Sequence, residues 1–507
     1  MSAPYDWSRG EVAVVGLGRS GTCATMLLRR LGARVYASDT NAGQAVSRQA
    51  EPLQAAGADV QCGGHDLDRL ARASIVVASP GVPPSAPALV AARAAGVPVI
   101  SEIEVALAAM PRLRYIAVTG TNGKTTVTAL IAHLLRSVGG DAVAAGNIGV
   151  PLSEVALRHV TPAWVALELS SFQLHDTPSI NPTVGVLTNL SPDHLDRYAS
   201  VEAYFADKAL LFSRASNASQ WVVNADDTAV MSLVRSVPGT HLRFSASGRL
   251  ADAFLGGKGK QQLIVCDEPL LMRDQWPLLG DHNVANALAA ALAVMRADPS
   301  HSSLDDRSRL AEALQSFRPP PHRLNPVADV HGVLWIDDSK ATNVESARVA
   351  IQSMTRPTIL LLGGRHKGAP YGSLLDAIAH HCRIVLAYGE AAPLIERDLA
   401  GRAAVQRIDG GFDDVMQRAR AVARPGDAVL LSPACSSYDM FNNYEERGMA
   451  FAAASGKMIS NERSPCGNRI VTCTRCSAFA AVICHGRISK EAIPENKSLR
   501  ANPATPF

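Results

Sequence analysis

The sequence predicts an α/β protein of about three domains, each built around a mainly parallel sheet. At roughly 100–200 residues per domain, a chain of 507 residues is too long for one ordinary core. Short β-branched runs alternate with Ala- and Leu-rich helical stretches along most of the chain, a pattern typical of parallel sheets. With 47% hydrophobic and 19% charged residues, the chain can build sizeable cores.

The strand-like runs and the prolines predict where the domains begin and end. Runs expected to form strands lie at 12–15, 74–78, 115–119, 165–169, 184–188, 359–362 and 428–431. The first sheet is expected to end near residues 99–102, and the prolines at 319–321 suit a linker because they lack amide donors. We therefore expect domains at 1–103, 104–319 and 320–455, followed by an irregular, disordered tail at 456–507.

The charge balance and the termini argue against several classes of function. The 49 Lys and Arg barely exceed the 46 Asp and Glu, and the tail alone holds eight basic against three acidic residues. Nucleic-acid binding is therefore not expected. No apolar run approaches the ~18 residues of a membrane span. The N-terminus also lacks the basic, apolar and small-residue segments that follow one another in a secretion signal. Nine scattered cysteines do not suggest a disulfide scaffold, so we expect a cytoplasmic protein.

The strongest motif follows the strand expected at 115–119. Residues Gly120, Thr121, Asn122, Gly123, Lys124, Thr125 and Thr126 form a glycine-containing turn that leads into a helical stretch at 127–135. In this arrangement backbone N–H groups surround phosphate oxygens, Lys124 reaches the outer phosphates and a threonine hydroxyl can bind Mg²⁺. A chance glycine turn is the alternative. We expect the turn to be exposed and to contribute little to the core.

A second glycine motif opens the chain. Gly16, Gly18 and Gly21 follow the first strand, and Asp39 ends the next one. This pattern favours a diphosphate at a helix N-terminus with an acidic group near a sugar or base. A nicotinamide dehydrogenase is the natural competitor, but hydride transfer does not need the loop at 120–126.

Polar clusters recur where strands are expected to end. Glu168 ends an apolar strand, a position that suits Mg²⁺, and residues 189–197 follow another strand with several ionisable groups. The alternative for that loop is a solvated turn without a functional role. Asn283 and Asn286 open a helix and could recognise an adenine edge or simply cap and pack. Further clusters lie at 321–323, 335–343, 363–368 and 432–441, and together they would line a cleft.

These motifs, in this order, resemble the Mur ligase family, the ATP-dependent amide-forming enzymes of bacterial cell-wall synthesis. The resemblance covers about residues 8–454 and rests on 120–126, 167–174, 193–197, 282–286, 321–323, 338–343 and 432–441. It implies an N-terminal Rossmann-like domain for a UDP group, a central P-loop ATPase domain and a C-terminal Rossmann-like domain for an amino acid. The chain is most similar to the member that adds D-glutamate.

The resemblance also implies roles for individual residues. The predicted ATP site comprises 120–126, Asn286, Arg323 and Asp338, and the predicted metal ligands are Thr125, Glu168, His194 and Lys208. Lys208 is expected to be carbamylated; without the resemblance it would be a solvated helix lysine. Lys124, His194, Lys208 and Lys340 are the expected catalytic residues. The expected substrate contacts are Ser20, Asp39 and Thr40 for UDP, Asn147 for the muramoyl group, Thr342 between the nucleotide and the amino acid, and Lys367, Ser437, Tyr438 and Tyr444 for glutamate.

The implied reaction is ligation of D-glutamate to UDP-N-acetylmuramoyl-L-alanine through an acyl phosphate, with ATP and Mg²⁺, by a monomer in peptidoglycan precursor synthesis. L-Glutamate or another amino acid is the first alternative, and a nucleotide-binding protein without catalysis is a remote one. Folate polyglutamylation is disfavoured because such ligases lack the N-terminal domain that carries Gly16 to Gly21. The tail looks foreign to the family, and its cysteines, Cys466 to Cys484, leave a zinc site as an alternative.

Overall fold

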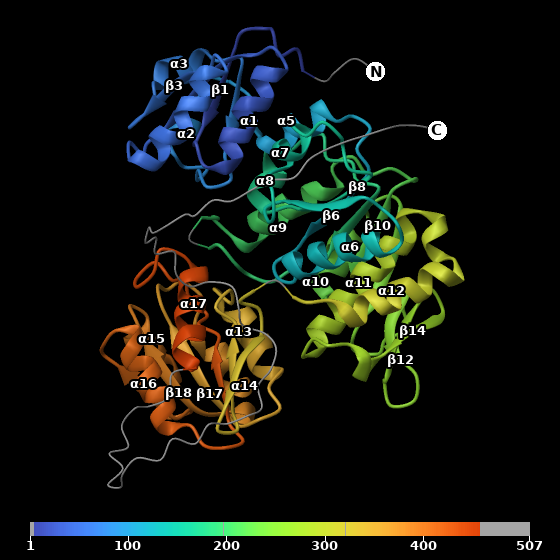
Figure 1. Cartoon of the computed structure of the whole chain (residues 1–507), viewed down its shortest axis with the longest axis vertical. Coiled ribbons are helices and arrows are strands. Elements are labelled where there is room, and N and C mark those ends of the chain that lie inside the picture. The colour runs from blue at the N-terminus through green and yellow to red at the C-terminus, as the bar shows by residue number, and fades with distance from the viewer. Residues whose placement is uncertain (1–4, 196, 320, 457–507) are drawn as a thin grey trace, which may run out of the picture. The chain divides into compact units, whose positions relative to one another are not determined.

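The computed structural model describes residues 5–195, 197–319 and 321–456, and the predicted tail at 456–507 lies outside them apart from its first residue. Three sheets follow one another along the chain (Figure 1). The expected three-domain α/β fold is confirmed. Among the described residues, no helix is both long and apolar enough to cross a membrane.

The N-terminal domain, blue in Figure 1, holds a five-stranded parallel sheet in the order β3-β2-β1-β4-β5. Its strands are β1 (Glu11–Val15), β2 (Arg34–Asp39), β3 (Asp59–Cys62), β4 (Ile75–Ala78) and β5 (Val99–Ser101). Its helices are α1 (Arg19–Arg30), α2 (Gln44–Ala55), α3 (Leu67–Arg72), α4 (Pro87–Ala94) and α5 (Glu102–Ala109). The glycine motif lies between β1 and α1, as a diphosphate-binding turn requires.

The central domain holds a nine-stranded sheet in the order β14-β13-β12-β11-β10-β9-β6-β8-β7. Its strands pair in parallel except in the pairs β12–β13 and β13–β14, which are antiparallel. Its strands are β6 (Tyr115–Thr119), β7 (Ala142–Gly146), β8 (Trp164–Glu168), β9 (Val184–Leu187), β10 (Gln220–Asn224), β11 (Thr240–Ser245), β12 (Ala253–Gly256), β13 (Gln262–Val265) and β14 (Glu268–Met272). Its helices are α6 (Lys124–Ser137), α7 (Leu152–Ala156), α8 (Ser171–His175), α9 (Val201–Ala209), α10 (Thr228–Val234), α11 (Asp281–Ala297) and α12 (Leu304–Ser316).

The C-terminal domain holds a six-stranded sheet in the order β15-β16-β20-β17-β18-β19, in which only β15 runs antiparallel. Its strands are β15 (Asn325–Val330), β16 (Val333–Asp337), β17 (Thr358–Gly363), β18 (Cys382–Tyr388), β19 (Val405–Ile408) and β20 (Ala428–Leu431). Its helices are α13 (Val344–Gln352), α14 (Leu375–His381), α15 (Ala392–Leu399), α16 (Phe412–Val422) and α17 (Tyr444–Ser455).

Helices α6 and α11 form the centre of one core beneath the phosphate-binding turn. Residues 286–295 of α11 are all buried, and α6 and α11 pack against each other on the central sheet. The alanines of α11 leave little side chain between the helix and the strands, so the backbone can approach closely. This packing fixes the N-terminus of α6, where the phosphate-binding turn ends.

Two buried carboxylates connect α5 to the central domain. Glu102 accepts hydrogen bonds from the backbone of Leu152 and Ser153 at the start of α7, and Glu104 accepts from the backbone and hydroxyl of Ser179. Burial raises the pKa of Glu102, although the bonds from Ser153 oppose the rise. These contacts hold the end of the first sheet against the elements that carry the site.

Candidate active site

Loops of the central and C-terminal domains enclose a cavity of about 420 Å³. The central domain contributes the turn at 121–125, the ends of β7 and β8, and the loop that follows β9; the C-terminal domain contributes the loop after β16 and the start of α17. Thirteen predicted site residues line the cavity: Thr121, Asn122, Gly123, Lys124, Thr125, Asn147, Glu168, His194, Arg323, Lys340, Thr342, Lys367 and Tyr444. The structure therefore brings together groups that lie more than 200 positions apart in the sequence.

The phosphate-binding turn has a conformation that requires two of its glycines. Gly120 has φ +141°, and a Cβ there would lie 2.0 Å from the hydroxyl of Thr188; Gly123 has φ +81°, and a Cβ would lie 2.5 Å from Oδ1 of Asn286. Any side chain at either position would therefore clash as well as strain the backbone. Contrary to expectation, the turn is not exposed, because Thr121 and Thr125 are both at least 95% buried.

Lys124 begins α6 and folds back over the turn. Its Nζ donates hydrogen bonds to the carbonyl oxygens of Gly120, at 2.9 Å, and Thr121, at 2.7 Å. Burial lowers the pKa of Lys124, whereas Glu168 and Asp193 favour the ammonium form. The ammonium is thus held at the cavity by oxygens that phosphate oxygens could replace.

Glu168 presents a buried oxygen without a partner. The side chain is 1% exposed, and its Oε1 accepts a hydrogen bond from Nδ2 of Asn147 at 2.9 Å. Among the described residues nothing hydrogen-bonds to its Oε2. Buried polar atoms are normally paired, and carboxylate oxygens are ligands that Mg²⁺ prefers. The unpaired oxygen therefore fits a divalent cation.

The loop after β9 supplies a second acid and an imidazole. Asp193 accepts hydrogen bonds from the backbone of His194, at 2.9 Å, and from Nδ2 of Asn343 in the C-terminal domain, at 2.8 Å. Burial alone would raise the pKa of Asp193, but the nearby His194 and Lys367 together with the hydrogen bonds from His194 and Asn343 lower it. Burial lowers the pKa of His194. A neutral imidazole is the form that binds a metal.

Lys208 on α9 is 1% exposed, so the alternative of a solvated helix lysine is wrong. Its Nζ lies 4.7 Å from the centre of the Tyr204 ring. Burial and the nearby Lys124 set the pKa of Lys208 well below its ordinary value, despite opposing contributions from Asp193 and Glu168. A neutral amine in this position can react with an electrophile such as CO₂.

No group of three or more His, Cys, Asp or Glu side chains within the described ranges is arranged to hold a metal ion. Glu168 and His194 line one cavity, and Thr125 lines it with them. A metal site there would thus need oxygen ligands from a hydroxyl, from phosphate or from a modified lysine. This donor set has the hard-oxygen character suited to Mg²⁺.

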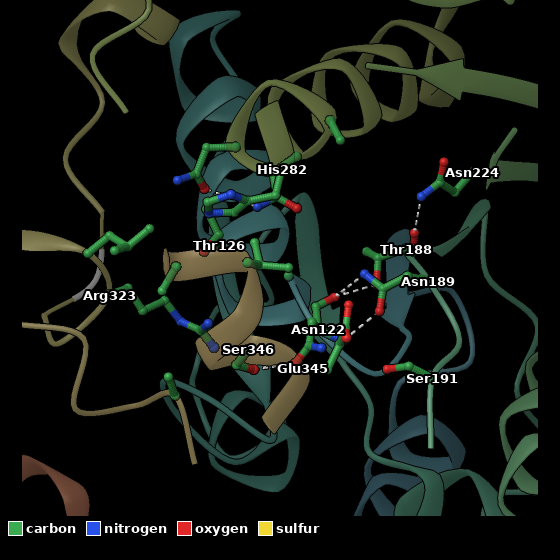
Figure 2. A pocket seen from close by; sticks show the side chains of 18 of the residues that line it. Asn122, Thr126, Thr188, Asn189, Ser191, Asn224, His282, Arg323, Glu345 and Ser346 are labelled. Atoms are coloured by element: carbon green, nitrogen blue, oxygen red, sulfur yellow. Dashed lines mark hydrogen bonds between the residues drawn. The ribbon is translucent and has the colours of Figure 1, made fainter. Parts of the chain in front are cut away.

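A second pocket, of about 280 Å³, lies beside the turn (Figure 2). Figure 2 shows Asn122 joined to Thr188 and Asn189, whose side chains donate to the Asn122 carbonyl oxygen at 2.6 and 3.0 Å. Ser346 of α13 donates its hydroxyl to Oδ1 of Asn122 at 2.8 Å. The predicted nucleotide residues Gly123, Thr126, Asn286, Arg323 and Asp338 also line this pocket.

Burial shifts the pKa values of two side chains that line this pocket, Asp338 and His282. Burial raises the pKa of Asp338 to about 7, although the hydroxyl of Ser432, 2.8 Å away, and Arg323 oppose the rise. Burial and Arg323 lower the pKa of His282 to about 4. The imidazole is therefore neutral at pH 7. The pocket offers neutral amide and imidazole groups at α11, together with the Arg323 guanidinium.

Two lysines extend the site into the C-terminal domain. Lys340 Nζ lies 5.1 Å from the centre of the Tyr444 ring, and burial and Arg323 lower the pKa of Lys340 to about 8. Lys367 donates to the hydroxyl of Thr342 at 3.2 Å. Ser437 is buried and Tyr438 is 64% exposed, and neither lines the two cavities.

The predicted UDP residues lie in the N-terminal domain. Ser20 is in the first turn of α1, and Asp39 and Thr40 follow at the end of β2, so all three lie at the carboxyl edge of the first sheet. Asp39 accepts hydrogen bonds from the backbone of Leu17, at 2.6 Å, and Asn41, at 2.8 Å. None of the predicted UDP residues lines the two cavities described above.

Several lining residues carried no predicted role. Asp193 belongs to the motif at 193–197 but has no predicted role. Asn343 and Ser346 lie at the start of α13 and resemble ordinary helix-capping residues in sequence. Asn343 does cap α13 through Ser346, and its amide group also reaches Asp193. Only the paired placement of Asn343 and Ser346 on one helix turn could have suggested a second contact.

Comparisons with known proteins cover each domain in turn. Residues 10–101 match the family described as Mur ligase MurD-like, N-terminal domain; residues 118–294 match the Mur ligase middle domain; and residues 322–435 match the Mur ligase, glutamate ligase domain. The UDP-N-acetylmuramoylalanine–D-glutamate ligase of Acidobacterium capsulatum is 38% identical over 446 residues, or 87% of this chain and 95% of the relative. The enzyme of that name from Chromobacterium violaceum is 39% identical over 88% of this chain and 97% of the relative.

Solved structures share the fold at lower identity. The MurF ligase of Thermotoga maritima, solved in complex with ADP, has a TM-score of 0.56 at 17% identity and covers 83% of this chain and 95% of its own. UDP-N-acetylmuramate-alanine ligase MurC of the same organism has a TM-score of 0.54 at 18% identity, with 88% and 99% covered. Since three consecutive family domains and relatives of nearly full length agree, this chain belongs to the Mur ligase family.

Proposed function

We propose that this chain is an ATP-dependent ligase that joins the amino group of D-glutamate to the alanyl carboxylate of UDP-N-acetylmuramoyl-L-alanine, a step of peptidoglycan precursor synthesis. The observation that carries the proposal is the cavity in which Lys124, Glu168 and Lys340 converge. The substrates follow from the relatives, which match along nearly their whole length and carry this activity in their names. We expect the enzyme to act as a cytoplasmic monomer.

The nucleotide would occupy the pocket beside α11 and extend along the turn. The backbone at 120–126 and Lys124 would hold the phosphates, and Asn286, Arg323 and Asp338 would hold the nucleoside. Thr125, Glu168, His194 and Lys208 would hold Mg²⁺, which supplies charge neutralisation between the converging oxygens. The unpaired Oε2 of Glu168 and the lowered pKa of His194 support this metal site.

The chemistry needs activation of a carboxylate, because a carboxylate oxygen is a poor leaving group. The alanyl carboxylate would attack the γ-phosphate in line, and the resulting acyl phosphate would then lose phosphate to the glutamate amine. Lys124 and Arg323 would offset the negative charge of this transfer. Lys340, whose pKa is lowered to about 8, would lie between the nucleotide and the amino acid.

Lys208 is proposed to carry a carbamate. Its neutral amine would add to CO₂, forming an N–C bond and releasing one proton, and a nearby cation would stabilise the resulting anion. The burial of Lys208 and the lowered pKa of its amine support this assignment. The reaction reverses the charge of a side chain that would otherwise repel a metal.

The remaining residues are proposed to bind the substrates. Ser20, Asp39 and Thr40 would contact UDP at the edge of the first sheet, and Asn147 the muramoyl group beside Glu168. Thr342, Lys367, Ser437, Tyr438 and Tyr444 would surround glutamate. The proposed domains at 1–103, 104–319 and 320–455 would thus each supply one ligand site.

The test is release of phosphate from ATP with each substrate omitted in turn, combined with the mass of the product. The proposal requires release only when ATP, UDP-N-acetylmuramoyl-L-alanine and glutamate are all present, with a product heavier by one glutamyl residue. D-Glutamate should serve and L-glutamate should not. Release supported by a different amino acid would favour another ligase of the family, and ATP binding without turnover would favour a binding protein.

A further inference from the structure

We propose that Tyr371, through its contacts with His366 and Cys435, is a positioning residue for the amino-acid subsite. Its hydroxyl joins the loop that carries Lys367 to the loop that carries Ser437. The inference rests on the proposed function, in which these two residues bind glutamate. It concerns groups that are adjacent in sequence to Lys367 and Ser437 or contact their loops, and that have no assigned role in the reaction.

The hydroxyl of Tyr371 bridges the two loops directly. It lies 3.0 Å from Nδ1 of His366 and 2.9 Å from Sγ of Cys435. Tyr371 and Cys435 are both 0% exposed. The Tyr371 backbone also donates a hydrogen bond to the carboxylate of Asp398 at 3.2 Å. The backbone of Tyr371 is therefore held by Asp398, while its side-chain hydroxyl contacts both loops.

The two loops leave neighbouring strands and have unusual backbone geometry. The loop at 363–368 follows β17 and the loop at 432–437 follows β20. Gly363 has φ +154° and no room for a Cβ, and Ala434, which is not a glycine, has φ +57°. Backbone bonds pair Arg365 with Ser436 at 2.9 and 3.1 Å. Strained loops of this kind keep their conformation only where surrounding contacts enforce it.

The contacts continue from these loops to the cavity. Lys367 follows His366 and donates to Thr342, and the backbone of Ala434 donates to Ala341 at 2.9 Å. Three loops are thus joined to one another, and the hydroxyl of Tyr371 adds a buried link between two of them. A shift of either loop would move Lys367 relative to Ser437.

The phenol of Tyr371 and the thiol of Cys435 are both neutral. Burial raises the pKa of Cys435 to about 12, and it raises the pKa of Tyr371 still further above its usual range. The thiol and the phenol therefore both keep their protons, and the hydroxyl can donate to one partner and accept from the other. Removal of the hydroxyl alone would leave the buried thiol of Cys435 and the partly buried imidazole of His366 without this partner.

The experiment compares Tyr371→Phe with the native full-length chain in steady-state ligation. The ring and its packing remain, so the change removes only the two hydroxyl contacts. We expect the KM for glutamate to rise about 5- to 10-fold, the range expected for loss of a hydrogen bond, while the KM values for ATP and the UDP substrate stay within about twofold. Cys435→Ser, which keeps a hydrogen-bonding group, should leave the KM for glutamate near native, and Cys435→Ala should raise it as Tyr371→Phe does.

The matched control is Tyr115→Phe. Tyr115 is 5% exposed, and its hydroxyl accepts a hydrogen bond from the backbone of Asn181 in the central domain. Its loss should lower stability comparably without changing the KM for glutamate. The inference is overturned if the glutamate KM of Tyr371→Phe stays native or if all three KM values rise together. If Tyr371→Phe does not fold, Cys435→Ala provides the same comparison. A native chain that ligates no glutamate would instead contradict the proposed function, on which this inference depends.

Discussion

In the central-domain wall of the cavity, the phosphate-binding turn is one continuous stretch that leads directly from β6 into α6, whereas the C-terminal wall is assembled from the loops after β16 and β17 and the starts of α13 and α17. In the central wall the turn at 120–126 is shaped by its own glycines and by the buried helices beneath it. In the C-terminal wall the loops after β16 and β17 are joined by the hydrogen bond from Lys367 to Thr342, and the loop after β17 is joined to the loop after β20 by the bonds between Arg365 and Ser436. We infer that changes in the first wall affect phosphate chemistry, and changes in the second affect the binding and approach of the amino acid.

The largest effect is expected from Lys124→Ala in the central wall. Loss of a preorganised charge at a phosphoryl transition state lowers turnover by about 10²–10³-fold or more. Two hydrogen bonds to the buried turn are lost as well, so unfolding in urea should show a cost of about 1–3 kcal/mol but a folded protein. Native turnover in this variant would remove Lys124 from the phosphate site.

Lys208→Arg should lose most ligation while retaining ATP binding. Arginine keeps the positive charge but does not form a carbamate, so the proposed metal site would face a cation. Lys258→Arg, at an exposed lysine of the same domain, is the matched control and should behave as native. A high-resolution map of the native protein should show three extra heavy atoms on the Lys208 amine; an active crystal with a bare amine would contradict the carbamate.

A smaller effect is expected where the two walls meet. Asn343→Asp keeps the cap of α13 but replaces the amide donor to Asp193 with a carboxylate. Repulsion between the two acids should reduce kcat about tenfold, since loss of a charge-assisted hydrogen bond costs about 1.5 kcal/mol or more. Asn343→Ser, which can also cap, should lose less. A native kcat in both variants would show that the contact between Asn343 and Asp193 does not affect catalysis.

Lys340 predicts a pH dependence of ATP binding. Burial sets its pKa at about 8 in the free protein, and nearby phosphates would favour the ammonium and raise the pKa. Binding should therefore take up protons above about pH 8, and ATP affinity should fall as the pH rises further. Calorimetry at about pH 9 in buffers of different ionisation heat measures the uptake. If Lys340→Gln takes up as many protons on ATP binding as the native protein, another group must bind the proton.

The smallest effect is expected from truncation after Ser455. The family matches end at residue 435 and α17 ends at Ser455, so ligation should stay within about twofold of native. Stoichiometric zinc in the native chain, lost together with folding on chelation, would contradict this prediction. The residues removed lie almost entirely outside the described part of the chain.

The same contrast between the walls explains how far the sequence could be interpreted. Strands at 115–119 and 428–431 were predicted to the residue, and the turn at 120–126 was recognised, because each depends on local pattern. The burial of Lys208 was not visible, since helical periodicity around it resembles that of a surface helix. The links from Asn343 to Asp193 and from Tyr371 to Cys435 join residues 150 and 64 positions apart. Such contacts exist only after the domains have folded.

The most direct test of the account follows the oxygen atoms of the alanyl carboxylate. In the proposed mechanism this carboxylate lies against the γ-phosphate of ATP, in the cavity that Lys124 and Lys340 line. With both carboxylate oxygens labelled with ¹⁸O, each phosphate released during ligation should carry one labelled oxygen, because attack on the phosphorus and loss of phosphate leave that atom behind. Unlabelled phosphate, released together with the correct product, would contradict an acyl phosphate and the arrangement of residues proposed to form it.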